Sequence, residues 1–359
     1  MSEQIFGDRR TRLKSILAEK SLDGMLISNL TNVRYLSGFT GSSGSCVITT
    51  DKDYFITDGR YMERSKNEVK GFERLIDYGT HLEIAEKYNA IADGSKLAFE
   101  SDNITVSAHQ QMQELFPKVK WEGTKMILEM LAAVKDQTEI DALKTAIEIT
   151  DSVFAEVLSL IKVGVTEKEI ALEIAKRYWK YAEGEAFPTI IASGANSALP
   201  HYQPAERKFH KGDFVVIDTG AKYAGYHADM TRTVVIGEAS EKHHEIYTIV
   251  KKSQQAGIDA ASAGVSCKAV DDATRAVITD AGYGDNYIHS AGHGIGLEIH
   301  AHPRFSQLSK DVLEENNVMT VEPGIYLSDW GGVRIEDDIW VKKSASEVLN
   351  KTTKELLIL

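Results

Sequence analysis

Two acid-bearing hairpins constrain this chain more than any other feature of its sequence. In the first, the apolar run 215–220 carries Asp218, and a glycine-bearing loop leads to Asp229, which opens a second β-branched run at 231–236. Such runs on both sides of a short connection predict two paired strands. An ionised carboxylate in an apolar setting is costly unless a positive charge lies beside it. We therefore expect this hairpin to bind something positive.

The same arrangement recurs near the C-terminus. Residues 318–324 and 332–339 form a second pair of strand-like runs, which carry Glu322 and Glu336. A single aspartate at a strand end is more often a turn former than a ligand, so Asp218 alone would prove nothing. Two acids on each of two hairpins are a joint pattern, and they indicate four carboxylates that meet at one site.

Two helices are predicted ahead of each hairpin. Apolar residues recur at helical spacing after Asp136 and Thr166, each of which begins a capping box with a glutamate three residues later, and again over 240–262 and 266–281. The C-terminal part thus runs helix, helix, hairpin, twice. We expect an α+β domain whose two halves face each other across the site.

The first 126 residues alternate helix and strand signals and predict a separate α/β domain. At 359 residues the chain is long enough for two domains, and we place them at 1–126 and 127–359. Glycines at 38, 41 and 44 resemble a phosphate-binding loop, but no Gly-Lys-Ser/Thr follows them. A plain turn between strands is the better interpretation.

The formal charge is 41 − 53 = −12, which disfavours nucleic acid as a partner because phosphate binding needs a basic surface. No apolar run reaches the length of a membrane span, and residues 1–10 lack the pattern of a signal peptide. We expect a cytoplasmic protein without membrane contact. Cys46 and Cys267 form no metal-binding spacing and are expected to be free thiols.

A histidine- and glycine-rich segment, 289–300, lies between the two hairpins. Carboxylates with one imidazole suit a divalent ion such as manganese, whereas the thiolates of structural zinc sites are absent. Four carboxylates carry more charge than one ion needs, so two bridged ions fit better and would make hydroxide available near neutral pH. Strand alternation puts Glu336 and Asp338 on one face, and parity alone does not choose between them.

Five motifs in order resemble those of the pita-bread (creatinase and methionine aminopeptidase-like) metallopeptidases, in the branch of Xaa-Pro aminopeptidase (aminopeptidase P) and prolidase. The motifs are Asp218-Thr-Gly-Ala221, Ala228-Asp-Met-Thr-Arg-Thr233, Gly292-His-Gly-Ile-Gly-Leu297, Val321-Glu-Pro-Gly-Ile-Tyr326 and Val333-Arg-Ile-Glu-Asp337. Residues 32–39 and 55–61 are similar to the creatinase-type N-terminal domain of that branch. The resemblance covers nearly the whole chain.

The resemblance implies roles for individual residues. It implies metal ligands at Asp218, Asp229, His293, Glu322 and Glu336, and so favours Glu336 over Asp338. It implies catalytic roles for His201, His300 and Glu322, with Glu322 taking a proton from the water that bridges the ions. It implies substrate contacts for His289, Tyr326 and Arg334. One departure is Ala301, which stands after His300 where the family most often has glutamate.

The leading hypothesis is an Xaa-Pro aminopeptidase that cleaves the bond before a proline at the second position of a peptide. An Xaa-Pro dipeptidase (prolidase) on the same site is the alternative. A methionine aminopeptidase is disfavoured by the large N-terminal domain, and a non-catalytic binding protein on this fold is disfavoured by the filled ligand positions. The resemblance further implies two ions per chain, with Mn²⁺ preferred and Co²⁺ or Zn²⁺ as alternatives, and a homodimer.

Overall fold

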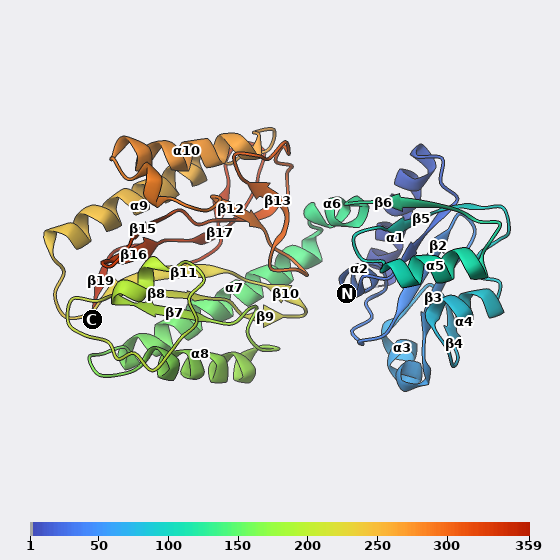
Figure 1. Ribbon diagram of the computed structural model, residues 1–359, viewed down its shortest axis with the longest axis horizontal. Helices are drawn as coiled ribbons and strands as arrows, with labels where there is room; N and C mark the ends of the chain where they lie inside the picture. Colours follow the sequence, from blue (N-terminus) through green and yellow to red (C-terminus); the bar gives the residue numbers. More distant parts are fainter. Residues whose placement is uncertain (1–2) are drawn as a thin grey trace. The chain divides into compact units, whose positions relative to one another are not determined.

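The computed structural model describes residues 3–359 and divides by contacts into two compact units, Met1–Ala132 and Ala133–Leu359. Helix α6 (Ile127–Ala133) lies almost wholly in the first unit (Figure 1). Its Leu131 carbonyl accepts a hydrogen bond from the Tyr35 hydroxyl, and its Glu129 accepts one from Asn32. The division therefore falls at the C-terminal end of α6, slightly beyond the boundary that the sequence predicts.

The N-terminal unit is built on a six-stranded sheet of order β4-β3-β2-β1-β5-β6 (Figure 1). Apolar residues of this sheet and of α4 and α5 form a core cluster, which includes Leu26, Ile56 and Met112. Its strands are β1 (Gly24–Ile27), β2 (Ser45–Thr49), β3 (Asp53–Thr57), β4 (Glu73–Ile76), β5 (Lys96–Glu100) and β6 (Lys120–Thr124). Its helices are α1 (Glu3–Glu19), α2 (Leu30–Ser37), α3 (Met62–Glu68), α4 (His81–Lys87) and α5 (Val106–Leu115). This confirms the predicted α/β domain.

The first half of the C-terminal unit packs two helices on a four-stranded sheet of order β19-β11-β8-β7. Both predicted capping boxes are present, at the starts of α7 and α8. The helices are α7 (Gln137–Val157) and α8 (Glu167–Tyr181). The strands are β7 (Ile190–Ser193), β8 (Phe214–Thr219) and β11 (Met230–Val235), with β19 (Leu357–Ile358) from the chain end and a small ribbon of β9 (Lys222–Tyr223) and β10 (Tyr226–His227).

The second half repeats the plan with α9 (Glu241–Ala260) and α10 (Cys267–Asp280) over a five-stranded sheet of order β13-β12-β14-β17-β18. Its strands are β12 (Gly292–Gly294), β13 (Ala301–Phe305), β14 (Val318–Val321), β17 (Asp337–Trp340) and β18 (Glu347–Val348). A ribbon of β15 (Gly324–Leu327) and β16 (Gly331–Arg334) lies beside them. The α+β expectation and the doubled helix, helix, hairpin order are confirmed.

The two halves meet along β11, which lies next to β16 and β17 (Figure 1). The Glu336 main-chain N–H donates to the Thr231 carbonyl over 3.1 Å. The Thr233 hydroxyl donates to the Arg334 carbonyl over 2.9 Å. These contacts bring the acids of the second hairpin against those of the first. Among the described residues, no helix has the length and apolar character needed to cross a membrane.

Candidate metal centre

The four predicted acids converge where the two hairpins meet. Asp218 lies on β8 opposite Thr231, and Asp229 immediately precedes β11. Glu322 follows β14, and Glu336 occupies the break between β16 and β17. Asp218 is 8%, Asp229 5% and Glu336 1% exposed. Carboxylates this deep in a protein require a cation or must hold a proton.

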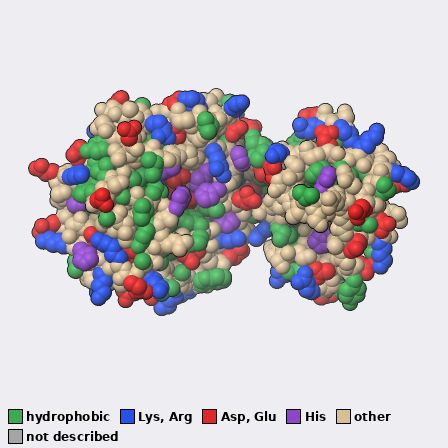
Figure 2. Space-filling model, in the orientation of Figure 1, with side chains coloured by type: hydrophobic (Ala, Val, Ile, Leu, Met, Phe, Trp, Pro, Cys, Tyr) green, Lys and Arg blue, Asp and Glu red, His purple; other side chains and the backbone are tan. Residues whose placement is uncertain are grey.

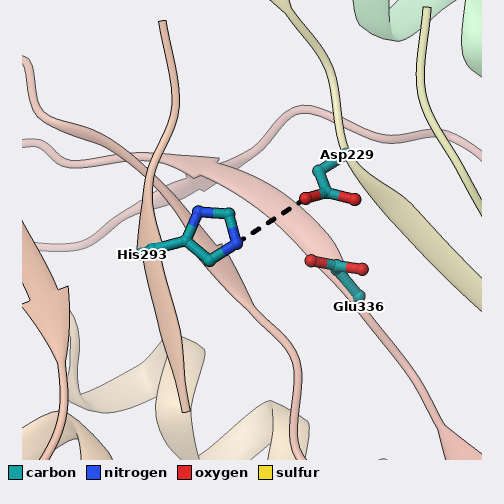
Figure 3. A group of neighbouring side chains, drawn as sticks. All are labelled: Asp229, His293 and Glu336. Atoms are coloured by element: carbon teal, nitrogen blue, oxygen red, sulfur yellow. Dashed lines mark ion pairs between the residues drawn. The ribbon is translucent and has the colours of Figure 1, made fainter. Parts of the chain in front are cut away.

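Three of the residues form a compact group that could hold a metal ion. One ligand atom from each of Asp229, His293 and Glu336 lies within 4.8 Å of the others (Figure 3). The Nε2 atom of His293 lies 3.7 Å from Oδ2 of Asp229 and 3.4 Å from Oε1 of Glu322. These distances show that acids from both hairpins lie close to the imidazole of the segment between them.

The imidazole of His293 has the form that a metal ligand needs. Its Nδ1 atom lies 3.1 Å from the Gly294 carbonyl, which can only accept, so Nδ1 carries the proton and Nε2 faces the acids with a lone pair. Burial lowers the pKa of His293 to about 4, and the nearby charge of Arg304 acts in the same direction. The ring is therefore neutral at physiological pH.

The acids have strongly perturbed proton affinities. Burial, and then the charges of Glu336 and Asp218, raise the pKa of Asp229 well above its ordinary range. Burial and the charges of Glu322 and Asp218 do the same for the pKa of Glu336. Burial raises the pKa of Glu322 to about 7, although Arg334 opposes it. Bound divalent cations would offset both the burial and the mutual repulsion that cause these shifts.

Two carboxylate oxygens add a geometric argument for cations. Oδ1 of Asp218 and Oε1 of Glu336 are buried, and no donor in residues 3–359 hydrogen-bonds to them. Arg334 donates to Asp218, but one guanidinium against four carboxylates leaves −4 + 1 = −3 when all are ionised. Orphaned oxygens, excess negative charge and one neutral imidazole form a donor set that fits divalent metal ions.

Neighbouring groups orient these acids. The Thr231 hydroxyl donates to Oε2 of Glu336 over 2.7 Å. Oδ2 of Asp338 accepts the main-chain N–H of Asp229 over 3.0 Å. Asp338 therefore supports Asp229 from the far side, whereas Glu336 enters the group with His293. The structure distinguishes two residues that strand parity left equivalent.

A cavity of about 500 Å³ opens beside the acids, and histidines gather in this hollow of the C-terminal unit (Figure 2). His201, His289 and His300 line it, together with Arg334. The His289 Nε2 atom lies 2.9 Å from the Tyr326 hydroxyl, and burial lowers the pKa of His289 to about 3. Burial also lowers the pKa of His300, whose ring centroid is 4.6 Å from that of His293.

Tyr326, for which the resemblance implies a substrate contact, lies beside two residues of the cavity lining. Its hydroxyl accepts a hydrogen bond from Nη1 of Arg334 over 2.9 Å and contacts His289, and the side chain is 5% exposed. The described lining of the cavity does not include it. The Tyr326 hydroxyl thus links His289 and Arg334, two residues of the cavity lining.

Sequence reasoning missed Arg304 and the apolar wall of the cavity, which includes Phe187, Pro188 and Ile190. Arg304 is exposed on β13, directly across the sheet from His293. No strand signal at residues 301–305 predicts that these two residues pair. Arg304 adds a guanidinium to a cavity whose other side is acidic.

Two family models match the chain: "Metallopeptidase family M24" over residues 141–343 and "Creatinase/Prolidase N-terminal domain" over residues 9–134. The chain belongs to metallopeptidase family M24. The predictions of a creatinase-like N-terminal domain, a pita-bread catalytic domain and a metallopeptidase are confirmed. Membership in M24 also implies divalent metal ions, which the donor set fits.

Relatives of the M24 chain are similar along their whole length. An Xaa-Pro dipeptidase of Pyrococcus furiosus is 35% identical over 98% of this chain and 99% of its own. The solved structure of an Xaa-Pro dipeptidase from Bacillus anthracis has a TM-score of 0.94 at 40% identity and covers 99% of this chain and 100% of its own. That of an X-Pro aminopeptidase from Thermotoga maritima has a TM-score of 0.90 at 37% identity, with 98% and 99% covered.

Proposed function

We propose that this metallopeptidase is an Xaa-Pro dipeptidase (prolidase). The sequence analysis favoured an Xaa-Pro aminopeptidase, and the comparisons support its alternative better. The observation that carries the proposal is full-length similarity, at 35% and 40% identity, to two proteins named Xaa-Pro dipeptidase. One relative at 37% identity is named an aminopeptidase, so the substrate length has to be tested.

Arg304 gives the dipeptidase proposal a physical basis. A dipeptide presents a free carboxylate one residue beyond the scissile bond, whereas a longer peptide presents a neutral amide there. The Arg304 guanidinium lines the same cavity as the acids and can bind a carboxylate through charge-assisted hydrogen bonds. The exposed position of Arg304 makes this a contribution to substrate affinity rather than a fixed structural pair.

The candidate ligands Asp218, Asp229, His293, Glu322 and Glu336 would hold divalent ions that polarise the scissile carbonyl and lower the pKa of water. Glu322 lines the cavity, and its Oε1 atom lies 3.4 Å from Nε2 of His293, so its carboxylate could accept a proton from that water and return it to the leaving nitrogen. Burial lowers the pKa of His300, so its neutral ring can form a hydrogen bond with substrate. The ring nitrogens of His289 contact the Ser290 carbonyl and the Tyr326 hydroxyl, so this ring offers substrate a packing contact. His201 lies in the lining, where it can contact the peptide.

We also propose two ions per chain, with manganese as the preferred metal. Four carboxylates and one imidazole support this count, because one divalent ion would leave the site negatively charged even with Arg334 present. Metal analysis of gently purified protein tests it. About two equivalents of manganese supports the proposal, and one equivalent or a different metal contradicts it.

The deciding experiment uses an Xaa-Pro dipeptide and the same peptide extended by one residue, each with added manganese and after chelation. Cleavage confined to the dipeptide and lost on chelation supports the dipeptidase. Cleavage of the longer peptide instead supports the aminopeptidase. Cleavage of neither peptide by metal-loaded protein rejects the proline assignment.

Self-association is a further proposal, which rests on the family resemblance alone. A light-scattering mass of about twice 39.7 kDa would support a homodimer, and a mass equal to one chain would refute it.

A further inference from the structure

Helix α10 carries an ion pair that lies outside the cavity and outside the candidate ligand set. We propose that Asp271 and Arg275 are positioning residues, which hold the segment 287–291 and thereby set His289 and Glu322 for the reaction. The proposal rests on the peptidase function proposed above. It assigns a role to two charged residues that touch neither metal nor substrate.

Asp271 is fully buried and is surrounded by donors. Its Oδ1 atom accepts the main-chain N–H of Ala291 over 3.0 Å. Its Oδ2 atom accepts Nε of Arg275 over 3.1 Å and the side-chain amide of Gln307. A buried carboxylate with this many donors fixes the position of the groups that donate to it.

Arg275 holds the same segment from the other side of the pair. Its Nη1 atom donates to the Tyr287 carbonyl over 2.9 Å, and its Nη2 atom donates to the His289 carbonyl over 2.9 Å. The guanidinium carbon also lies 4.2 Å from the centre of the Tyr287 ring. A planar fork can serve two carbonyls and a carboxylate at once, which a lysine cannot do.

The segment 287–291 has no regular secondary structure that could satisfy its main-chain groups. Main-chain polar groups that leave water need a partner, and the ion pair supplies one to the Tyr287 carbonyl, the His289 carbonyl and the Ala291 N–H. The ion pair thus satisfies the main-chain groups of this irregular segment, as strand pairing satisfies those of the neighbouring strands.

Two hydrogen-bonded routes lead from the pair into the site. On the first, the Ala291 carbonyl accepts the main-chain N–H of Glu322 over 2.9 Å, so Asp271 and Glu322 bond to the same short stretch of chain. On the second, the ring of His289 contacts the Tyr326 hydroxyl, which in turn binds Arg334. Arg334 donates to Asp218. Both routes end at candidate metal ligands.

The routes predict different kinetic effects for two conservative variants. Asp271→Asn keeps the shape but removes the charge that pairs with Arg275, and in either amide orientation its NH2 group faces a donor, so the segment 287–291 and Glu322 lose their fixed position. We expect kcat and manganese affinity to fall by about 10- to 100-fold, with KM little changed. Arg275→Lys keeps the charge but loses the fork on the His289 carbonyl, so we expect KM to rise more than kcat falls.

The matched control is Arg177→Lys, together with Glu173→Gln. This pair is likewise a carboxylate and an arginine four residues apart, on helix α8. Its carboxylate is more exposed than that of Asp271, and neither residue lines the described cavity. Both controls should keep the wild-type kcat, KM and manganese affinity. Circular dichroism and thermal melting establish that each variant is folded under the assay conditions.

Manganese affinity is measured by calorimetry without substrate, so it tests the positioning even if the wild type cleaves neither proline peptide. Weaker manganese binding by folded Asp271→Asn, with the controls unchanged, supports the proposal. Folded Asp271→Asn and Arg275→Lys with wild-type manganese affinity, kcat and KM would overturn it. Equal losses in the α8 controls would also overturn it, because the effect would then be general to helix ion pairs.

Discussion

The guanidinium of Arg334 donates from Nη2 to Oδ2 of Asp218, and both side chains are almost fully buried. The same guanidinium donates from Nε to the Thr231 hydroxyl over 3.0 Å and from Nη1 to the Tyr326 hydroxyl over 2.9 Å. The Arg334 guanidinium therefore orients Asp218 and Thr231, which both belong to the first hairpin, and Tyr326, which contacts His289. This fixed geometry makes Arg334 more than a source of positive charge.

Replacing Arg334 by lysine separates these two contributions. Arg334→Lys keeps a positive charge but cannot reach all three acceptors in one plane, so we expect kcat/KM and metal affinity to fall by about 10- to 100-fold. Steady-state kinetics and a manganese titration measure both quantities. A lysine variant with wild-type values would show that charge alone suffices.

Glu336 is expected to be essential for metal binding, and its amide variant tests this without disturbing the fold. Glu336→Gln keeps the volume and an acceptor for the Thr231 hydroxyl, but it removes the negative charge. We expect tight metal binding and hydrolysis to disappear, together with the rise in melting temperature that manganese gives the wild type. The exposed acid Glu315, which lies 3.8 Å from Lys343, provides the control variant Glu315→Gln, which should bind metal normally.

Most of the fold could be predicted from local signals in the sequence. Three signals depend only on residues that are close in sequence, so they can be recognised without tertiary structure. They are the capping boxes at Asp136 and Thr166, the apolar periodicity of the long helices and the alternation around Asp218. The acid-bearing hairpins could be located for the same reason. The eight-residue helix α2 was not predicted, because its glycine-rich C-terminal flank obscured it.

Features that depend on pairing between segments far apart in the sequence could not be predicted. Strand alternation puts Glu336 and Asp338 on one face, so parity could not choose between them. In the structure β16 ends at Arg334 and β17 begins at Asp337, so Glu336 lies in a break that alternation does not predict. The position of Arg304 depends on its pairing with His293 across an irregular ladder. Such contacts join residues far apart in sequence, and no local periodicity encodes them.

Metal-free protein should show a pH dependence to which Glu322 contributes, together with Asp229 and Glu336, whose pKa values are raised in the same direction. The pKa of Glu322 is raised from 4.5 to about 7, so the folded state holds a proton that the unfolded chain releases. This contribution to the free energy of unfolding is fully present below pH 4.5 and is lost as the pH rises through about 7. Its slope approaches about 1.4 kcal/mol per pH unit.

Buried histidines act in the opposite sense, so the prediction is best tested as a difference. The pKa values of His289 and His293 are lowered to about 3 and about 4, and their contribution is lost as the pH falls below 6.5. Denaturant unfolding of chelated wild type and Glu322→Gln at several pH values cancels this term. The stability of the wild type relative to the variant should fall with rising pH, and a flat difference would contradict the raised pKa.

Arg304 should govern the preference for a free carboxylate. Replacing it by glutamine removes a charge-assisted contact, so we expect KM for an Xaa-Pro dipeptide to rise by about 10-fold while kcat changes little. The amidated dipeptide lacks the negative charge and should show nearly the same KM with both proteins. Lys310→Gln removes another cation of the same unit, which does not line the described cavity, and should leave both substrates unaffected. Equal changes for the acid and the amide would show that Arg304 acts on the site in general, and the carboxylate contact would have to be abandoned.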